Sequence, residues 1–261
     1  MSSSNVSWDI TGPVARLTFT RPQSRNALTW DMYDALADAC RQADEDERIR
    51  ALIIRGSGGS FAAGTDIGQF ADFRTGDDAV AYERRLEAMV SRLEQVTVPT
   101  VAEVDGAAVG GGCLLALACD IRLGSPRARF GIPVSRTLGN CLSMANMGRV
   151  VDLIGPARTR DLMLTGRLMD AAEAHEAGLA NHVYPHAELM DRALELAAEI
   201  AAKPPWALAA AKEVVNLALD GDLSGHLARE LDAFALAFTT EDQKEGMAAF
   251  FEKREALFQG R

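Results

Sequence analysis

Three consecutive glycines, Gly110 to Gly112, constrain this chain more than any other feature of its sequence. They follow a mostly apolar β-type run, Thr100 to Val104, and precede an apolar run typical of a buried helix, Cys113 to Ala118. Because glycine has no Cβ, a ligand can approach the backbone N–H groups that point out of a helix start. A helix N-terminus also carries a partial positive charge. The stretch therefore predicts either a plain strand-to-helix turn or a cradle for a negatively charged oxygen.

A second glycine-rich turn, Gly56 to Gly64, also follows a short apolar segment, Ala51 to Arg55. Upstream, Val14 to Thr20 alternates apolar and polar residues, which predicts a strand paired in a hairpin with Val6 to Ile10. Between these strands, Thr29 is the expected N-cap of an amphipathic helix. The order strand, helix, strand predicts an α/β fold whose sheet is buried on both faces.

The second half of the chain changes from mixed to helical. We expect further strands at residues 121–123, 128–130 and 182–184, and helices at 77–96, from about 142, at 156–164 and at 171–178. After Pro185 four helical segments follow without a strand: 186–202, 205–219, 223–238 and 240–258. A boundary near Lys203 therefore divides an α/β core, residues 1–200, from a helical region, residues 201–261, that is suited to oligomerisation.

Charge and composition limit the class of partner. With 27 Lys and Arg against 37 Asp and Glu, the net charge of −10 argues against nucleic acid or an anionic membrane. No apolar run approaches the roughly 20 residues of a membrane span, and the N-terminus lacks the pattern of a signal peptide. The cysteines have no metal-binding spacing and are expected to be buried free thiols in a reducing compartment, which predicts a cytoplasmic protein. They are Cys40, Cys113, Cys119 and Cys141.

Motifs of several other enzyme classes are missing. The sequence contains no Gly-x-Ser-x-Gly elbow, no phosphate-binding loop and no His-Glu-x-x-His. All four histidines follow residue 170, far in sequence from both glycine turns. A serine–histidine hydrolase is therefore disfavoured, and no metal is expected.

Several motifs, in order along almost the whole chain, resemble the crotonase (enoyl-CoA hydratase/isomerase) superfamily. Residues 21–28 read Arg-Pro-Gln-Ser-Arg-Asn-Ala-Leu, like the Arg-Pro-x-x-x-Asn-Ala-Leu of that family. Residues 60–67 are similar to its Phe-Ala/Ser-Ala-Gly-x-Asp segment, and residues 106–113 to its Gly-x-x-x-Gly-Gly-Gly segment. Residues 119–120 (Cys-Asp), 166–185 and 240–254 continue the resemblance.

The resemblance implies a fold and a chemistry. The expected fold is a spiral of ββα repeats followed by a C-terminal helical oligomerisation region, assembled as a homotrimer or a dimer of trimers. The shared chemistry is stabilisation of a thioester enolate, and the backbone N–H groups of Thr65 and Gly111 match the two oxyanion-hole donors. An acyl-CoA thioester is the implied substrate, with coenzyme A as part of that substrate and no separate cofactor.

The resemblance also implies residues that bind the substrate, most of them at its CoA end and Asn140 in the loop that lines the acyl pocket. Two of them, Arg25 and Lys253, carry charges that could meet phosphates, although a solvated surface charge explains either residue equally well. The full set is Arg25, Ala62, Ala63, Asp66, Ile67, Asn140, Phe250 and Lys253.

Two residues depart from the pattern of the family's hydratases, which use two glutamates to position and activate water. The first of these positions is Leu114 here, and the second is Val134. Neither side chain can move a proton, and each general acid–base group typically contributes about 10²–10⁴-fold to rate. Ordinary hydration of an enoyl-CoA is therefore doubtful.

Replacement polar groups would have to come from elsewhere. Arg136 and Ser135 are the favoured candidates because they adjoin Val134, and Arg136 could hold an acyl carboxylate or polarise a carbonyl. Loop packing or surface exposure is the competing interpretation. Further candidates are Asn140, Cys141 and Ser143 in the same loop and Tyr82, Glu83 and Arg84 in the helix from Asp77.

Three functions stay open on the sequence. The first is an acyl-CoA enzyme of the crotonase type, whose reaction could be decarboxylation, C–C cleavage or hydration of an unusual acyl group. The second is a non-catalytic acyl-CoA binding protein that kept the thioester site. The third is hydrolysis of a thioester on the same spiral.

Overall fold

The computed structural model describes residues 5–71, 73–139, 141–219, 229, 232, 235–236 and 239–260. A six-stranded sheet has the order β1-β2-β3-β4-β6-β9, and β5, β7 and β8 form a smaller second sheet. All neighbours in the large sheet are parallel except the β1–β2 hairpin. The strands are β1 (Val6–Thr11), β2 (Val14–Phe19), β3 (Ala51–Gly56), β4 (Thr100–Val104), β5 (Ala107–Val109), β6 (Ile121–Gly124), β7 (Arg129–Gly131), β8 (Met169–Asp170) and β9 (His182–Val183).

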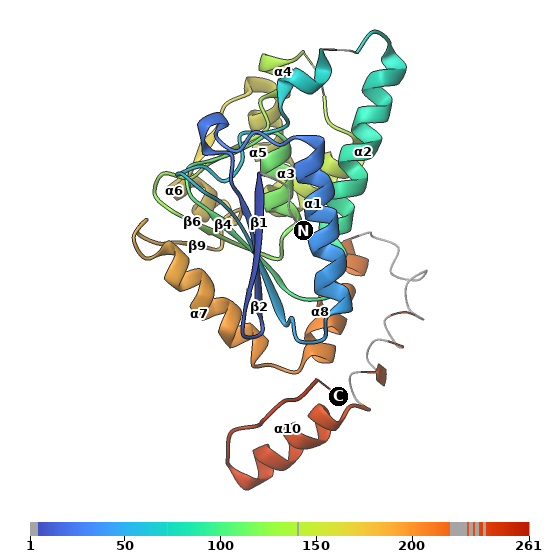
Figure 1. Ribbon diagram of the computed structural model, residues 1–261, viewed down its shortest axis with the longest axis vertical. Helices are drawn as coiled ribbons and strands as arrows, with labels where there is room; N and C mark the ends of the chain where they lie inside the picture. The colour runs from blue at the N-terminus through green and yellow to red at the C-terminus, as the bar shows by residue number, and fades with distance from the viewer. Residues whose placement is uncertain are drawn as a thin grey trace.

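Helices follow the strands and cover both faces of the large sheet (Figure 1). Two short 3-10 helices, η1 (Pro22–Ser24) and η2 (Ile67–Phe70), lie in the loops. The α-helices are α1 (Trp30–Glu45), α2 (Gly76–Glu94), α3 (Gly111–Ala118), α4 (Val134–Thr137), α5 (Met144–Thr165), α6 (Ala171–Glu176), α7 (Leu189–Ala201), α8 (Pro205–Leu219) and α10 (Glu241–Glu252).

Successive turns of the chain repeat a ββα unit. In one turn β4 joins the large sheet, β5 joins the small sheet and α3 follows; β6, β7 and α4 repeat this order. An isolated bridge from Ala62 to Ala108 extends the small sheet to the turn that contains β3 and α2. The arrangement is the predicted spiral of ββα repeats.

The alternation of side chains along the central strands builds two cores. Ile54, Ala102 and Val104 face a core shared with α1, α2 and α3. Ile53 and Val101 face the opposite side, where α7 covers the sheet. Both faces are therefore buried, as expected for strands that are almost wholly apolar.

Helix α8 is tied to the α/β core by an ion pair. Lys212 Nζ lies 2.8 Å from Asp120 Oδ2, and the lysine side chain is 9% exposed. The same carboxylate oxygen accepts hydrogen bonds from the backbone N–H and hydroxyl of Thr100. Beyond α8, helix α10 lies at one end of the molecule (Figure 1). In the ranges described, no helix combines the length and apolarity that crossing a membrane requires.

Some elements differ from the sequence predictions. The short elements β5, β8 and α4 are not predicted, because two to four residues carry no periodicity. Helix α10 ends at Glu252 rather than at residue 258, because Lys253 adopts a left-handed conformation with φ of 56°. Most of the helix predicted at 223–238 lies outside the described residues. Among the cysteines, Cys141 is exposed rather than buried.

Candidate functional site

The triple glycine forms a strand-to-helix turn. Helix α3 begins at Gly111, two residues before the apolar run that predicts it, and Gly110 is its N-cap with φ of 56°. The Gly110 N–H donates to the Gly131 carbonyl on β7 at 2.9 Å, which fixes the turn against the small sheet. Gly111 is thus the first helical residue, whose N–H has no acceptor within its own helix.

The second glycine-rich segment is fixed along the loop before α1. Leu28 N–H donates to the Gly64 carbonyl at 2.8 Å, and Asp66 N–H donates to the Leu28 carbonyl at 2.9 Å. Thr65 lies between these two bonds, so its own N–H points away from Leu28. Within the described residues, neither the Thr65 nor the Gly111 N–H donates a hydrogen bond.

These two backbone donors lie close together. A Cβ built on Gly111 would lie 3.6 Å from Thr65 N and 3.1 Å from Thr65 Oγ1. A Cβ built on Gly64 would lie 3.8 Å from Gly111 N. Glycine at both positions therefore lets the two backbone segments approach each other closely, and a carbonyl oxygen could accept from both N–H groups.

Three hydroxyl groups form a chain beside this pair. Thr65 Oγ1 lies 2.9 Å from the Tyr33 hydroxyl and 3.0 Å from the Tyr82 hydroxyl. Tyr33 is fully buried, and burial raises the pKa of its hydroxyl above the ordinary value. Burial also raises the pKa of the half-buried Tyr82, against an opposing hydrogen bond from Thr65. Both hydroxyls are therefore protonated at neutral pH.

Aromatic rings surround the Tyr82 side chain. The centroid of its ring lies 4.8 Å from that of Phe70, 5.7 Å from that of Trp30 and 6.1 Å from that of Phe73. The Arg85 guanidinium carbon lies 4.1 Å from the centroid of Trp30. The rings join α1, η2 and α2 and fix the direction in which the Tyr82 hydroxyl points.

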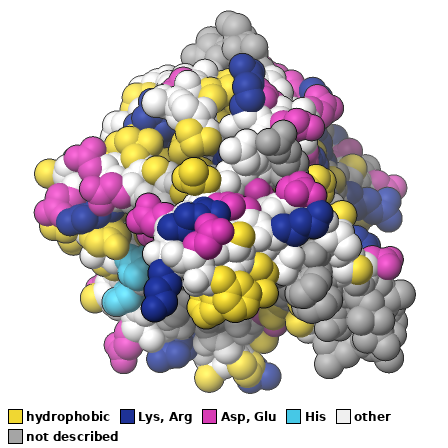
Figure 2. Space-filling view, turned by 90° about the horizontal axis from the view of Figure 1, so that it is seen from below, with side chains coloured by type: hydrophobic (Ala, Val, Ile, Leu, Met, Phe, Trp, Pro, Cys, Tyr) yellow, Lys and Arg dark blue, Asp and Glu magenta, His cyan; other side chains and the backbone are white. Residues whose placement is uncertain are grey.

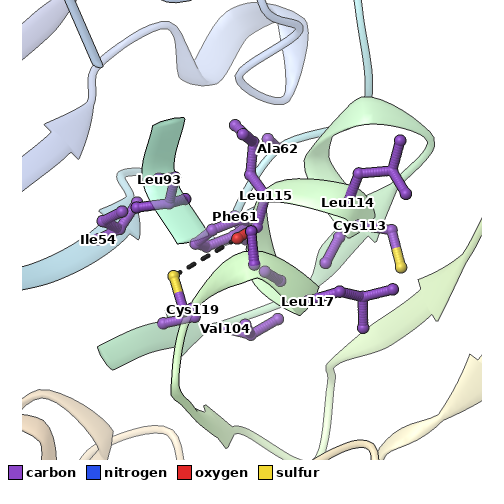
Figure 3. Close-up of a cluster of buried hydrophobic side chains, with 14 of the residues drawn as sticks. Ile54, Phe61, Ala62, Leu93, Val104, Cys113, Leu114, Leu115, Leu117 and Cys119 are labelled. Atoms are coloured by element: carbon purple, nitrogen blue, oxygen red, sulfur yellow. Dashed lines mark hydrogen bonds between the residues drawn. The ribbon is translucent and has the colours of Figure 1, made fainter. Parts of the chain in front are cut away.

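The two residues at the positions of the family's glutamates, Leu114 and Val134, both lie in apolar surroundings. Leu114 is completely buried in the main core, close to Cys113 and Leu115 (Figure 3). Val134 is the first residue of α4 and packs against the same core.

The residues beside Val134 contact the end of α5. The Ser135 hydroxyl donates to the Met163 carbonyl at 2.8 Å, and the Arg136 stem lies beside Gly166. Both side chains belong to exposed residues. Asn140 lies outside the described residues. Among the described residues, no hydrogen bond or ion pair joins Ser135 or Arg136 to Thr65 or Gly111, so their catalytic role stays a prediction.

Glu83, on the same helix as Tyr82, is held by the start of α5. Its Oε1 accepts a hydrogen bond from the Ser143 N–H at 2.9 Å and from the Asn146 amide at 3.3 Å. The Ser143 hydroxyl, which caps α5, donates to Glu87 at 3.2 Å. Through these bonds, Glu83 joins α2 to the start of α5.

The residues predicted to bind CoA divide between two places. Asp66 forms an ion pair with Arg21 at 2.5 Å and accepts from the Gly68 N–H at 3.0 Å, and these partners hold the pKa of its carboxyl below the usual value. Ile67 beside it is 64% exposed. The Arg25 carbonyl accepts from the Ala63 N–H at 3.0 Å, which joins the loop before α1 to the second glycine-rich segment, and Arg25 itself is exposed.

The remaining predicted residues lie elsewhere. Ala62 is buried and bridges to the small sheet. Phe250 and Lys253 are exposed at the end of α10, where Phe250 packs edge-on against Phe251 at 5.7 Å. Across the described part of the chain, no group of three or more His, Cys, Asp or Glu side chains could hold a metal ion.

The family resemblance implies Thr65 and Gly111, but nothing in the sequence points to Tyr33. Tyr33 lies on the buried face of α1, so its spacing in the sequence predicts only a core residue. The contact between its hydroxyl and Thr65 is a product of the tertiary fold.

Comparison with known proteins identifies the family to which the chain is similar along almost its full length. A family model described as enoyl-CoA hydratase/isomerase matches residues 9–261. A probable enoyl-CoA hydratase from Mycobacterium bovis is 42% identical over 245 residues, which cover 94% of each chain. A short-chain-enoyl-CoA hydratase from Clostridium acetobutylicum is 36% identical over 255 residues, which cover 97% of each.

Solved structures agree as well. An enoyl-CoA hydratase subunit from Geobacillus kaustophilus superimposes with a TM-score of 0.91 at 37% identity, covering 98% of both chains. The enoyl-CoA hydratase from Bacillus anthracis gives a TM-score of 0.91 at 32% identity, covering 98% of this chain and 100% of the other.

Proposed function

The chain belongs to the enoyl-CoA hydratase/isomerase family, and on that premise we propose that it processes an acyl-CoA thioester by stabilising its enolate. The Thr65 and Gly111 N–H groups are the proposed oxyanion hole. The single observation that supports this most is their proximity: glycine at positions 64 and 111 lets the two backbone segments approach closely, and neither N–H donates a hydrogen bond within the described residues.

The energetic argument rests on where the charge develops. An enolate places negative charge on the thioester oxygen, and backbone donors fixed in advance stabilise it without reorganising. Removal of one such donor in other enzymes costs about 3–4 kcal/mol of transition-state stabilisation. The start of α3 adds a partial positive charge at the same place.

The reaction that follows enolate formation should not depend on a carboxylate at the two usual positions. Leu114 and Val134 cannot activate water, so we propose an enolate reaction such as decarboxylation or C–C cleavage rather than ordinary hydration. Thioester hydrolysis is a weaker alternative, because the part of the chain described places no histidine beside Thr65.

A second candidate is a non-catalytic acyl-CoA binding protein. The observation that favours it is the same pair of apolar residues: the chain keeps the thioester donors but has no ionisable group at either position. For both candidates we propose a cytoplasmic homotrimer or dimer of trimers, with Arg25, Asp66 and Lys253 near the CoA moiety.

Two measurements separate these candidates. Calorimetric titration with butyryl-CoA and with CoA alone tests binding, and the loss of enoyl-thioester absorbance tests hydration of crotonyl-CoA. We expect butyryl-CoA to bind and crotonyl-CoA to be hydrated more slowly than by the Clostridium acetobutylicum relative, by about 10²-fold or more.

Each result has a clear reading. Hydration at the rate of that relative would contradict the importance of Leu114 and Val134. Binding with no turnover on a broad acyl-CoA panel, 2-carboxyacyl thioesters included, would favour the binding protein. Failure of every acyl-CoA to bind would overturn the proposed oxyanion hole.

A further inference from the structure

The hydroxyl chain of Tyr33, Thr65 and Tyr82 has no part in the oxyanion hole itself. Its middle member is the side chain of a residue whose N–H is a proposed donor, so Tyr82 lies one hydrogen bond from that residue. Its far end is closed, because the Tyr33 hydroxyl is buried against Gly111. At the other end, the Tyr82 side chain is only half-buried. A proton could therefore enter or leave the hydroxyl chain at Tyr82 and not at Tyr33.

Because both of the usual carboxylates are missing, a proton-transfer group has to come from elsewhere. A thioester oxygen accepting from the Thr65 N–H would carry the acyl α carbon two bonds away, near the side-chain end of the same residue. In the described residues, the side chains that form hydrogen bonds with Thr65 carry hydroxyls and not carboxylates. Glu83, the acidic neighbour of Tyr82 in sequence, is directed to Ser143 and Asn146 instead.

We propose that Tyr82 is the proton-transfer residue of this site, with Thr65 Oγ1 and the Tyr33 hydroxyl as the groups that position and polarise it. The inference rests on the proposed function. In the step, the enolate electron pair at the α carbon takes the Tyr82 proton, a C–H bond forms, the thioester C=O returns, and Tyr82 is left as phenolate.

The chain is suited to stabilise that phenolate. When Tyr82 loses its proton, Tyr33 can donate to Thr65 Oγ1 and the Thr65 hydroxyl can donate to the Tyr82 oxygen, so both hydrogen bonds point toward the charge. Water then returns the proton, because the Tyr82 side chain is only half-buried.

The protonation state sets the kind of reaction that this residue serves. Because burial holds the pKa of Tyr82 above its ordinary value, the residue is a proton donor at neutral pH and a base only at high pH. It can therefore protonate an enolate made by breaking a C–C bond, and it is a poor base for starting hydration. This agrees with the missing carboxylates.

Exchange of the acyl α protons in D₂O tests the proposal without knowledge of the natural substrate. By microscopic reversibility, the phenolate that receives a proton in the reverse step removes one from butyryl-CoA, and mass spectrometry measures the deuterium incorporated. The exchange rate should rise about tenfold per pH unit from 7 to 9, because the phenolate fraction rises in that proportion below the pKa.

Four variants make the test specific. Tyr82→Phe should lower the exchange rate by about 100-fold or more, while the Kd for butyryl-CoA stays within a few fold. Thr65→Val keeps the backbone N–H but should slow exchange, and Thr65→Ser should restore it. Tyr184→Phe is the matched control: the third tyrosine of the chain packs near His182 and Arg192, on another part of the molecule.

The possible outcomes separate the inference from its premise. Unchanged exchange in Tyr82→Phe, or a loss in Glu83→Gln with a flat pH profile, would overturn the role of Tyr82 and leave the oxyanion hole standing. Bound butyryl-CoA that shows no exchange in the unaltered protein would do the same. Absence of butyryl-CoA binding would overturn the proposed function itself. If Tyr82→Phe does not fold, the Thr65→Val and Thr65→Ser pair decides.

Discussion

At the scale of single residues, the space beside Gly111 governs the site. A Cβ at this position would meet the buried Tyr33 hydroxyl and would lie 3.1 Å from Thr65 Oγ1. Tyr33 is fully buried in the core and cannot move aside without disturbing α1. The absence of a Cβ at Gly111 therefore affects both the position of the backbone donors and the packing of the core.

The substitution Gly111→Ala should damage binding and stability together. We expect the free energy of unfolding to fall by about 1–3 kcal/mol, as for other overpacked cores, and acyl-CoA affinity to fall as well. Urea unfolding and calorimetric titration measure the two effects.

Gly148→Ala is the matched control for this prediction. A Cβ at Gly148, inside α5, meets nothing within 4 Å, so alanine should stabilise the helix by about 0.5–1 kcal/mol and leave binding intact. If Gly111→Ala behaved like Gly148→Ala, the tight packing described beside Gly111 would be wrong.

Residue-level prediction from sequence reaches backbone groups set by a local motif, but it cannot reach side chains that only tertiary contact brings together. The resemblance of the two glycine-rich motifs to the family implies Thr65 and Gly111, because each motif fixes a backbone N–H by its place in a short segment. The Tyr33 hydroxyl reaches Thr65 from 32 positions away, and no local pattern records that contact. Ser135 and Arg136 were favoured only by their place beside Val134.

At the scale of elements, Arg149 joins the two helices that flank the site. From α5 its guanidinium reaches Glu87 at 3.0 Å and Glu94 at 2.8 Å on α2, and its side chain is 11% exposed. It also donates to Ser91 Oγ at 2.9 Å. The start of α5 is thereby held against the helix that carries Tyr82.

The substitution Arg149→Met should loosen this junction. It removes the positive charge but keeps much of the stem, which leaves Glu87 and Glu94 without their shared partner. We expect the free energy of unfolding to fall by about 2 kcal/mol, less than for a fully buried pair because both carboxylates are partly exposed. Urea unfolding at neutral pH measures the change.

Arg192→Met provides the comparison. Its ion pairs with Glu188 and Glu195 lie on the exposed side of α7, and such pairs contribute about 0–1 kcal/mol. If the free energy of unfolding fell equally in Arg149→Met and Arg192→Met, the α2–α5 ion pairs would stabilise the protein no more than exposed surface pairs do.

Long periodic elements follow from the sequence, and short ones do not. The amphipathic spacing and the Thr29 cap predict α1, and the almost wholly apolar run predicts β3. In contrast, α4 has only four residues and is held against α5, where the Ser135 hydroxyl donates to the Met163 carbonyl. Gly155, with φ of 73°, breaks the backbone of α5 where the sequence predicts a new helix.

At the scale of the whole molecule, the C-terminal end presents apolar side chains that the described chain does not cover. Phe250 is 77% exposed and Phe251 73%, and hydrophobic groups lie between charged ones on this end of the molecule (Figure 2). Exposed apolar surface of this kind is typical of an interface. It supports the proposed assembly of three or six copies.

The substitutions Phe250→Asp and Phe251→Asp, made together, should dissociate the assembly. Two charges in an apolar interface lose hydration without gaining partners, so the sedimentation coefficient should fall to that of a monomer. Val80→Asp, an exposed apolar residue on α2, is the control. A monomer before any substitution would contradict the assembly itself.

The buried position of Leu114 limits how this molecule can be changed by engineering or by descent. A glutamate introduced there would stand inside a closed core, where burial favours the neutral acid and can raise a carboxyl pKa by about 3–5 units. The side chain would be present without its charge, and the core around it would be strained. We therefore expect that a glutamate at position 114 alone does not give this chain ordinary hydratase chemistry, and that its neighbours would have to change with it.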